Sequence, residues 1–209
     1  MAAADFFEMR ITGSGGHAAI PDLAIDPIPC GAAIVQSLQS IVSRRVAALE
    51  RAVVSVTIFE SGSALNVIPG SARLGGTARS FSPDVRKLLE NSIHEIAMAT
   101  AKAYDCTIEI DWQPGYPPTV NHAEESARAV AVAANVLGTE NIITDLPPSM
   151  GAEDFSYMLA EKPGSYIWLG AGPAKNGAML HNDRYDFNDD VLATGASYWA
   201  RLAESELPK

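Results

Sequence analysis

The order of secondary structure predicted for the first 112 residues limits the fold more than any other feature of this 209-residue chain. Segments rich in alternating or β-branched residues predict four strands, and apolar residues at helical spacing predict two helices between them. The predicted elements, in chain order, are strand 6–12, helix 28–46, strands 53–59 and 72–81, a long helix beginning at Ser82, and strand 107–112. Two strand–helix–strand units in succession are the pattern of the split βαβ, or ferredoxin-like, fold.

A change of composition at residues 113–118, which are rich in proline and glycine, predicts a domain boundary. The elements expected beyond it are helix 123–136, a short strand near 142–143, a helix opening near 152, strand 166–169, a glycine loop and helix 190–204. Two or three short strands with helices make a poor independent core. We therefore predict an α/β (α+β) chain, with a ferredoxin-like βαββαβ domain in residues 3–115 and an incomplete α/β domain in residues 116–209.

The charge balance and the cysteine count exclude several classes of protein. A net charge of −10 argues against a nucleic-acid partner, because phosphate binding needs a basic surface. No apolar run reaches membrane-spanning length, and the N-terminus lacks the basic segment of a signal peptide. Two distant cysteines do not suggest a disulfide framework, so we expect buried thiols in a protein of the reducing cytoplasm.

A glycine-rich loop at residues 13–16 precedes His17. The loop formally fits a dinucleotide-binding pattern, but three prolines delay the helix that such a fold needs at once, so we reject the nucleotide interpretation. A lone histidine on a glycine loop is more often incidental than catalytic. Its predicted exposure nevertheless makes His17 a candidate for contact with a substrate.

Four further residues are candidates for a site. The Asn66 amide can donate and accept hydrogen bonds, and the Arg79 guanidinium can hold a carboxylate through two parallel hydrogen bonds. Glu153 lies where a loop enters a predicted helix, and His181 lies among acidic residues, a plausible setting for a metal ligand. Taken alone, Asn66, Arg79 and Glu153 are each more typical of a structural or solvated position. His181 has no second histidine or cysteine at ligand spacing.

Taken together and in order, these motifs resemble the hippurate-hydrolase-like amidohydrolases, a branch of the dinuclear-metal aminoacylase and carboxypeptidase family. The resemblance extends over nearly the whole chain and is specific. The matching segments are GSGGHAAIP (13–21), ALNVIP (64–69), GTARSF (76–81), GAEDFSYM (151–158) and LHNDRYDFND (180–189).

The resemblance implies a metal-binding α/β domain that is interrupted by a ferredoxin-like lid, through which the enzyme forms a homodimer. Residues 3–115 look like this lid, and residues 116–209 look like the C-terminal part of the catalytic domain. No segment matches the N-terminal part, which carries the other metal ligands and a glutamate general base. The implied activity is metal-dependent hydrolysis of the amide bond of small N-acyl amino acids.

The resemblance also implies a role for each candidate. His181 matches a metal ligand, and His17 matches the lid histidine that stabilises the oxyanion in the partner subunit's site. Asn66 and Arg79 match positions that hold the substrate carboxylate, and Glu153 matches a segment lining the substrate site. Two divalent ions per complete site are implied, and zinc, manganese, cobalt and nickel all suit such ligands.

Two hypotheses about function therefore stand beside each other. The first is that the chain is a truncated N-acyl-amino-acid amidohydrolase, inactive alone; the short lead-in before the first predicted strand favours truncation. The second is a non-catalytic dimerisation or ligand-binding module, with the ferredoxin-like part as its working surface.

Overall fold

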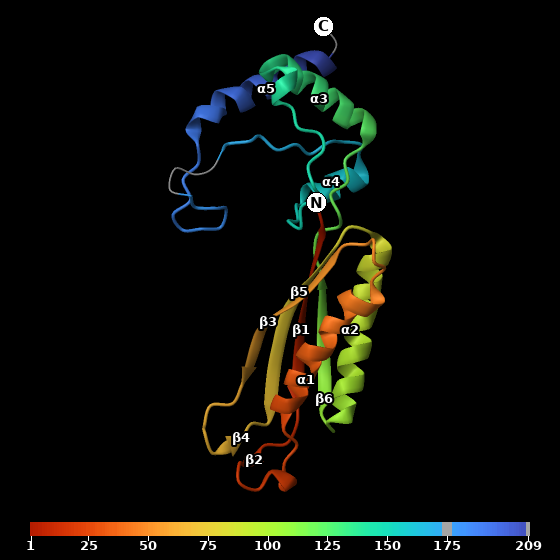
Figure 1. The fold of residues 1–209 in the computed structure, drawn as a ribbon, viewed down its shortest axis with the longest axis vertical. Coiled ribbons are helices and arrows are strands. Elements are labelled where there is room, and N and C mark those ends of the chain that lie inside the picture. The colour runs from red at the N-terminus through yellow and green to blue at the C-terminus, as the bar shows by residue number, and fades with distance from the viewer. Residues whose placement is uncertain (173–176, 208–209) are drawn as a thin grey trace. The chain divides into compact units, whose positions relative to one another are not determined.

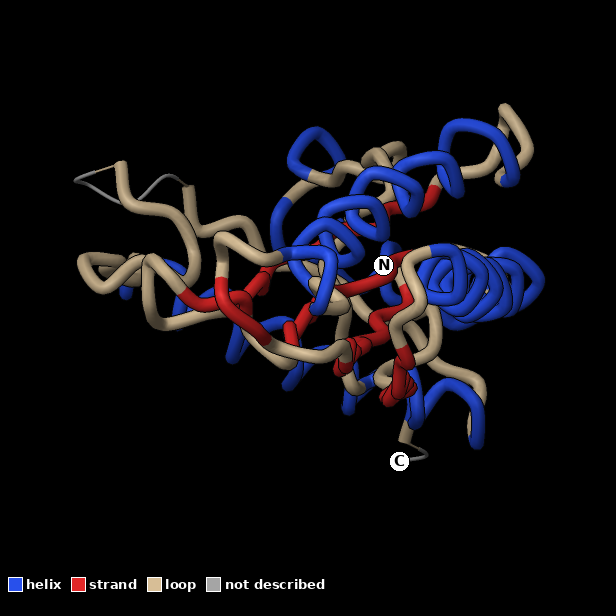
Figure 2. Tube along the Cα trace, turned by 90° about the horizontal axis from the view of Figure 1, so that it is seen from below, coloured by secondary structure: helices blue, strands red, loops and turns tan. Residues whose placement is uncertain are grey.

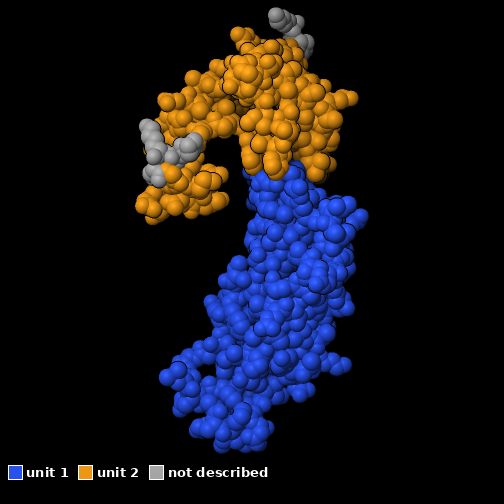
Figure 3. Space-filling model, in the orientation of Figure 1, with its two compact units in different colours: residues 1–119, 148–157 blue, residues 120–147, 158–209 orange. Residues whose placement is uncertain are grey.

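The computed structural model describes residues 1–172 and 177–207, which form two compact units (Figures 1 and 3). Unit 1 comprises residues 1–119 and 148–157, and unit 2 comprises residues 120–147 and 158–209. The first part of unit 1 ends at residue 119, and the chain returns to unit 1 for ten residues. This return segment, residues 148–157, contains Glu153.

Unit 1 is built on a four-stranded antiparallel sheet with strand order β3-β5-β1-β6. Two helices pack against it (Figures 1 and 2). The elements in chain order are β1 (Ala3–Thr12), α1 (Pro27–Ser40), β3 (Ala52–Ser61), β5 (Ser71–Ser80), α2 (Pro83–Ala103) and β6 (Thr107–Pro114). This βαββαβ order, with both connections through helices on one face, confirms the predicted ferredoxin-like fold.

Two spacings of apolar residues, one along the strands and one along the helices, determine the core of unit 1. Along β1, Phe7, Met9 and Ile11 are buried, while the residues between them face the open side of the sheet. Buried residues of the helices recur every three or four positions. They are Cys30, Ile34, Leu38 and Ile41 on the first helical segment and Val85, Leu89, Ile93, Ala97 and Ala101 on α2. One face of the sheet and one stripe of each helix thus form a single core.

Capping residues set the helix starts. The Asp26 side chain accepts a hydrogen bond from the Ile28 N–H at 2.9 Å, and a proline occupies the first turn. Ser82 caps α2 in the same way. The first helix differs from the prediction at its other end, where residues 41–45 widen into a π-helical turn. There Arg45 pairs with Glu95 of α2 at 2.6 Å, so the turn directs this side chain toward the second helix.

A small two-stranded ribbon joins the glycine-rich loop before His17 to the segment that follows Asn66. β2 (Gly16–His17) pairs with β4 (Val67–Ile68), in antiparallel register. A Cβ atom on Gly15 would lie 2.8 Å from the Ile68 carbonyl oxygen, so only glycine permits this approach. The ribbon brings two segments about fifty positions apart in sequence into direct contact.

Unit 2 consists of helices and irregular segments in the part that the structure describes. Its helices are α3 (Ala123–Leu137), most of α4 (Phe155–Glu161) and α5 (Leu192–Glu206). It also has 3₁₀ turns at Thr139–Asn141 and Asp189–Val191, whereas the 3₁₀ turn at Pro21–Leu23 belongs to unit 1. The strands predicted near 142–143 and at 166–169 are not formed. The Asn121 side-chain amide instead donates a hydrogen bond to the Tyr166 carbonyl and accepts one from the Tyr166 N–H, each at 2.8 Å. The predicted glycine loop includes residues 173–176, which lie outside the described residues. In the described ranges, no helix is both long and apolar enough to cross a bilayer.

Two buried free thiols give unfolding a distinct pH dependence. Burial raises the pKa of Cys30, and the neighbouring Cys106 thiol raises it further, from the ordinary 9.0 to about 12. The folded state therefore keeps a proton that the unfolded chain loses above about pH 9. We expect the free energy of unfolding to fall over pH 9–12 by up to roughly 1.4 kcal/mol per pH unit for this thiol. Urea titrations at pH 8, 9 and 10 measure the slope. The slope should be shallower in Cys30→Ala, and equal slopes would contradict the assignment.

Candidate functional site

The ribbon places His17 beside Asn66. The Ala18 N–H donates to the Asn66 carbonyl at 3.1 Å, and both side chains are exposed. Nδ1 of His17 accepts the Ala19 N–H at 3.0 Å, so a neutral ring carries its proton on Nε2. Nε2 is then the ring nitrogen that can donate a hydrogen bond to a ligand.

Arg79 lies at the opposite end of the sheet from this ribbon. Its guanidinium sits 5.7 Å from the ring centre of Phe6, on the face that the helices leave open. In residues 1–172 and 177–207, no carboxylate lies within ion-pair distance of it. Eight positions of β5 separate Arg79 from Ser71, which lies beside the ribbon. At ~3.3 Å per residue, the two ends are about 26 Å apart along the strand. One small substrate cannot reach both ends within one copy.

The return segment, with Glu153, lies at the same end of the sheet as Arg79. The Ala2 N–H donates to the carbonyls of Ser149 and Gly151, both at 3.0 Å, just before β1 begins. Ala4, two positions later, pairs with Arg79 across the strands. Glu153 is half-buried, and its carboxylate accepts the Asp154 N–H at 3.1 Å. Unit 1 thus carries two of the predicted residues at each end.

His181 lies in unit 2, in an exposed turn with a backbone φ of 65°. Left-handed backbone is uncommon for a residue other than glycine, and such positions often occur at functional sites. Asn182 organises the turn, since its side-chain oxygen accepts the Arg184 N–H at 2.9 Å and its carbonyl accepts the Tyr185 N–H at 3.0 Å. The histidine ring therefore projects from a locally defined turn.

The described residues do not by themselves form a metal centre. Nowhere in these ranges do three His, Cys, Asp or Glu side chains gather closely enough to hold an ion. Two other histidines have structural contacts: the His94 ring packs against Trp112, and Nδ1 of His122 accepts the Gly164 N–H at 3.2 Å. His181 is thus the residue of this chain that remains as a metal-ligand candidate, and it would need ligands from elsewhere.

The open face of the sheet also carries a broad hollow of about 710 Å³, which is lined by charged residues. At its centre Arg73 pairs with Glu8 at 3.0 Å and with Glu60 at 3.1 Å, and hydrogen bonds to these carboxylates raise its pKa. None of the five predicted site residues lines it. Because its central cation is already paired on both sides, the hollow is not a candidate for anion binding.

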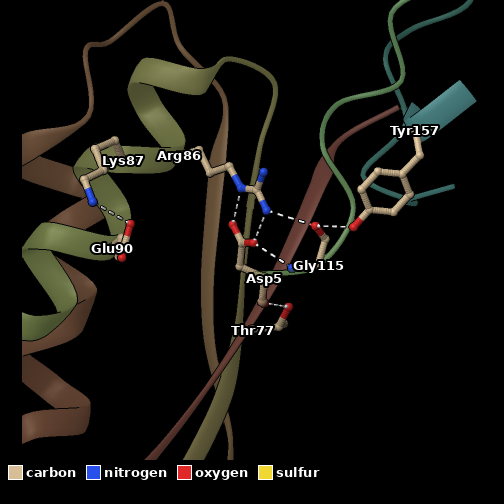
Figure 4. Close-up of polar contacts among 7 residues, drawn as sticks. All are labelled: Asp5, Thr77, Arg86, Lys87, Glu90, Gly115 and Tyr157. Atoms are coloured by element: carbon tan, nitrogen blue, oxygen red, sulfur yellow. Dashed lines mark hydrogen bonds and ion pairs between the residues drawn. The ribbon is translucent and has the colours of Figure 1, made fainter. Parts of the chain in front are cut away.

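A polar network at the Arg79 end was not predicted (Figure 4). Asp5 is 2% exposed and forms an ion pair with Arg86, and both contact the backbone of Gly115. The sequence holds one signal of it. Asp5 occupies the same inward-facing period as Phe7, Met9 and Ile11, where a buried carboxylate requires partners.

Comparisons with known proteins agree with this fold and these motifs. Residues 6–205 match the model of peptidase family M20/M25/M40. The Bacillus subtilis protein YhaA, named for a proposed amidohydrolase activity, is 38% identical over 205 residues, which are 97% of this chain and 52% of the relative. The hippurate hydrolase of Campylobacter jejuni is 37% identical over 203 residues, with the same two coverages.

A solved structure of an M20-family protein has a similar fold. The Bacillus subtilis YXEP protein, described as a dinuclear metal-binding peptidase from the M20 family, superposes with a TM-score of 0.70 at 26% identity. The match covers 97% of this chain and 49% of that protein. The chain therefore spans about half the length of the relatives that it matches.

Proposed function

Since the chain belongs to peptidase family M20/M25/M40, we propose that it forms part of a metal-dependent enzyme that hydrolyses the amide bond of small N-acyl amino acids. The similarity to a hippurate hydrolase supports this substrate class. The observation that carries the proposal is Arg79, a half-exposed guanidinium with no carboxylate partner in the described part of the chain. Such a group suits the free carboxylate that every N-acyl amino acid carries.

The roles proposed for the other residues follow their chemistry. His17 donates from Nε2 to the oxyanion that forms on the scissile carbonyl, and Asn66 beside it binds the substrate through its amide. Glu153 lines the substrate site near Arg79. His181 is one ligand of a site for two divalent ions, with zinc, manganese, cobalt or nickel as candidates. The remaining ligands and the general base come from outside these 209 residues.

We also propose that two copies associate through unit 1. About 26 Å of β5 separates the His17 end of the sheet from the Arg79 end, by strand geometry. If His17, Asn66 and Arg79 serve one small substrate, the His17 end of one copy has to meet the Arg79 end of another. The outer edges of β3 and β6 are both unpaired in the described sheet, and open edges of this kind can pair with a second chain.

The proposal is tested in a fusion enzyme, in which the part of YhaA that this chain does not match is joined to residues 1–209. We expect the fusion enzyme to hydrolyse hippurate with at least one of zinc, manganese, cobalt and nickel, and residues 1–209 alone to show no turnover. His181→Ala should abolish activity. His122→Ala is the matched control, because that ring has a backbone contact instead.

Circular dichroism and gel filtration establish that each protein is folded. A folded fusion enzyme that is inactive on a panel of N-acyl amino acids with all four metals would contradict the proposal. Equal activity of His181→Ala and the unsubstituted fusion would contradict the metal-ligand role. A ligand-binding module without catalysis would instead bind N-acyl amino acids in calorimetry, with no turnover in any combination.

A further inference from the structure

The Asp5–Arg86 pair holds the backbone of Gly115 from two sides (Figure 4). Nε of Arg86 donates to Oδ2 of Asp5 at 2.8 Å, and Nη2 donates to Oδ1 and, at 3.0 Å, to the Gly115 carbonyl. The Gly115 N–H donates back to Oδ1 of Asp5 at 3.0 Å. The N–H and the carbonyl of Gly115 are therefore both engaged by one buried ion pair.

The position of Gly115 is fixed sterically as well. A Cβ atom there would lie 2.3 Å from the Ala4 carbonyl oxygen, so another residue would push the segment away from β1. The hydrogen bond with Asp5 raises the pKa of Arg86 above its already high ordinary value, so Arg86 stays charged throughout the usual pH range. Steric contact and hydrogen bonds with the charged Arg86 thus hold Gly115 in place; we call Asp5, Arg86 and Gly115 the anchor.

Tyr157 attaches the return segment to this anchor. Its hydroxyl donates to the Gly115 carbonyl at 3.2 Å, so this oxygen accepts from both Tyr157 and Arg86. Its ring packs edge-on against Tyr116, with centroids 5.9 Å apart and planes at 77°. The start of the segment is tied by the Ala2 N–H, which donates to Ser149 and Gly151. Glu153 lies between these two attachments.

We propose that Tyr157 is a positioning residue, which holds the Glu153 segment on unit 1 at the end of the sheet that carries Arg79. The segment follows residues 120–147 of unit 2 in the chain, and nothing in the sequence order fixes it to unit 1. The hydrogen bonds of Tyr157 and Ala2 are what hold the segment on unit 1. The role of Glu153 in substrate binding depends on the proposed function. The attachment of the segment to unit 1 does not depend on it.

Hydrogen exchange on the 209-residue chain tests the attachment. Tyr157→Phe keeps the ring and removes only the hydroxyl. The reporters are the amides of Ala2, Ser156 and Tyr157, which are bonded to carbonyls within or at the ends of the segment. Loss of one hydrogen bond should accelerate their exchange about twofold to tenfold. Amides in the middle of α2 should exchange at the unsubstituted rate. Tyr104→Phe is the matched control, because Tyr104 is exposed and no residue in the described ranges hydrogen-bonds its hydroxyl.

Unchanged exchange at the three reporters would overturn the proposal, and so would equal acceleration in α2, since that indicates general destabilisation. A second readout uses the fusion enzyme, in which Tyr157→Phe should raise KM for hippurate about twofold to tenfold while kcat changes less than twofold. An unchanged KM in an active fusion enzyme would contradict the positioning role. An inactive fusion enzyme would count against the proposed function, and the exchange result would still decide the attachment.

Discussion

Asp5→Ala is expected to lower the free energy of unfolding of unit 1 by about 3 kcal/mol, because removal of one partner leaves the other charge of a buried pair uncompensated. The side chain of Asp5 is 3% exposed and that of Arg86 is 24% exposed, so water can reach the stranded guanidinium only in part. The Gly115 N–H loses its acceptor as well. Asp5→Asn keeps an acceptor for this N–H and removes the charge, so its effect should be smaller.

Urea unfolding followed by circular dichroism measures this loss. Glu8→Ala is the matched control: Glu8 lies on the same strand and also pairs with an arginine, but both side chains are close to half exposed. Its cost should stay below about 1 kcal/mol, as for other surface ion pairs. Equal losses for Asp5→Ala and Glu8→Ala would show that the Asp5–Arg86 pair does not stabilise unit 1 through burial.

Local signals account for the parts of the fold that the sequence predicts well. The helix starts at Pro27 and Pro83 follow from their capping residues, and the inward face of β1 follows from its alternation. These signals lie within a few residues of the element that they define. The ferredoxin-like order then follows from the succession of elements.

Features that depend on distant partners were missed. The β2–β4 ribbon joins two short segments whose pairing has no periodic signal. The strand predicted at 166–169 has an apolar sequence, but a strand needs a neighbour, and the described part of unit 2 offers none. Ile167, Trp168 and Leu169 stay 39–57% exposed as a result. An apolar run of this kind is typical of a segment that packs elsewhere in a larger fold.

In the candidate site too, local motifs were identified from the sequence, but arrangements that depend on distant residues were not. His17, Asn66, Arg79, Glu153 and His181 were identified by motifs that resemble a family, and the family is confirmed. Their separation into a His17–Asn66 end and an Arg79–Glu153 end could not be predicted, because it follows from the register of β1, β5 and the ribbon. The anchor around Asp5 was likewise missed, although an acidic residue in an apolar period signals a buried partner.

Mixing two inactive variants of the fusion enzyme should restore activity. His17→Ala and His181→Ala homodimers should each be impaired, the first by about 100-fold to 1000-fold because an oxyanion donor is lost. If His17 serves the partner's site, every mixed dimer has one site with both lesions and one with neither. After random exchange half of the dimers are mixed, which predicts recovery to about a quarter of the unsubstituted activity, as follows from a two-fold symmetric dimer.

This mixing experiment shows whether the two ends of the sheet serve one substrate only when two copies meet. Subunit exchange is confirmed separately by mass spectrometry of differently tagged protomers. We expect recovery from at most a few per cent to about a quarter of full activity, since one intact site forms in each mixed dimer. No recovery, with exchange confirmed and the unsubstituted fusion enzyme active, would contradict it, because each site would then keep one lesion and His17 would act within its own subunit.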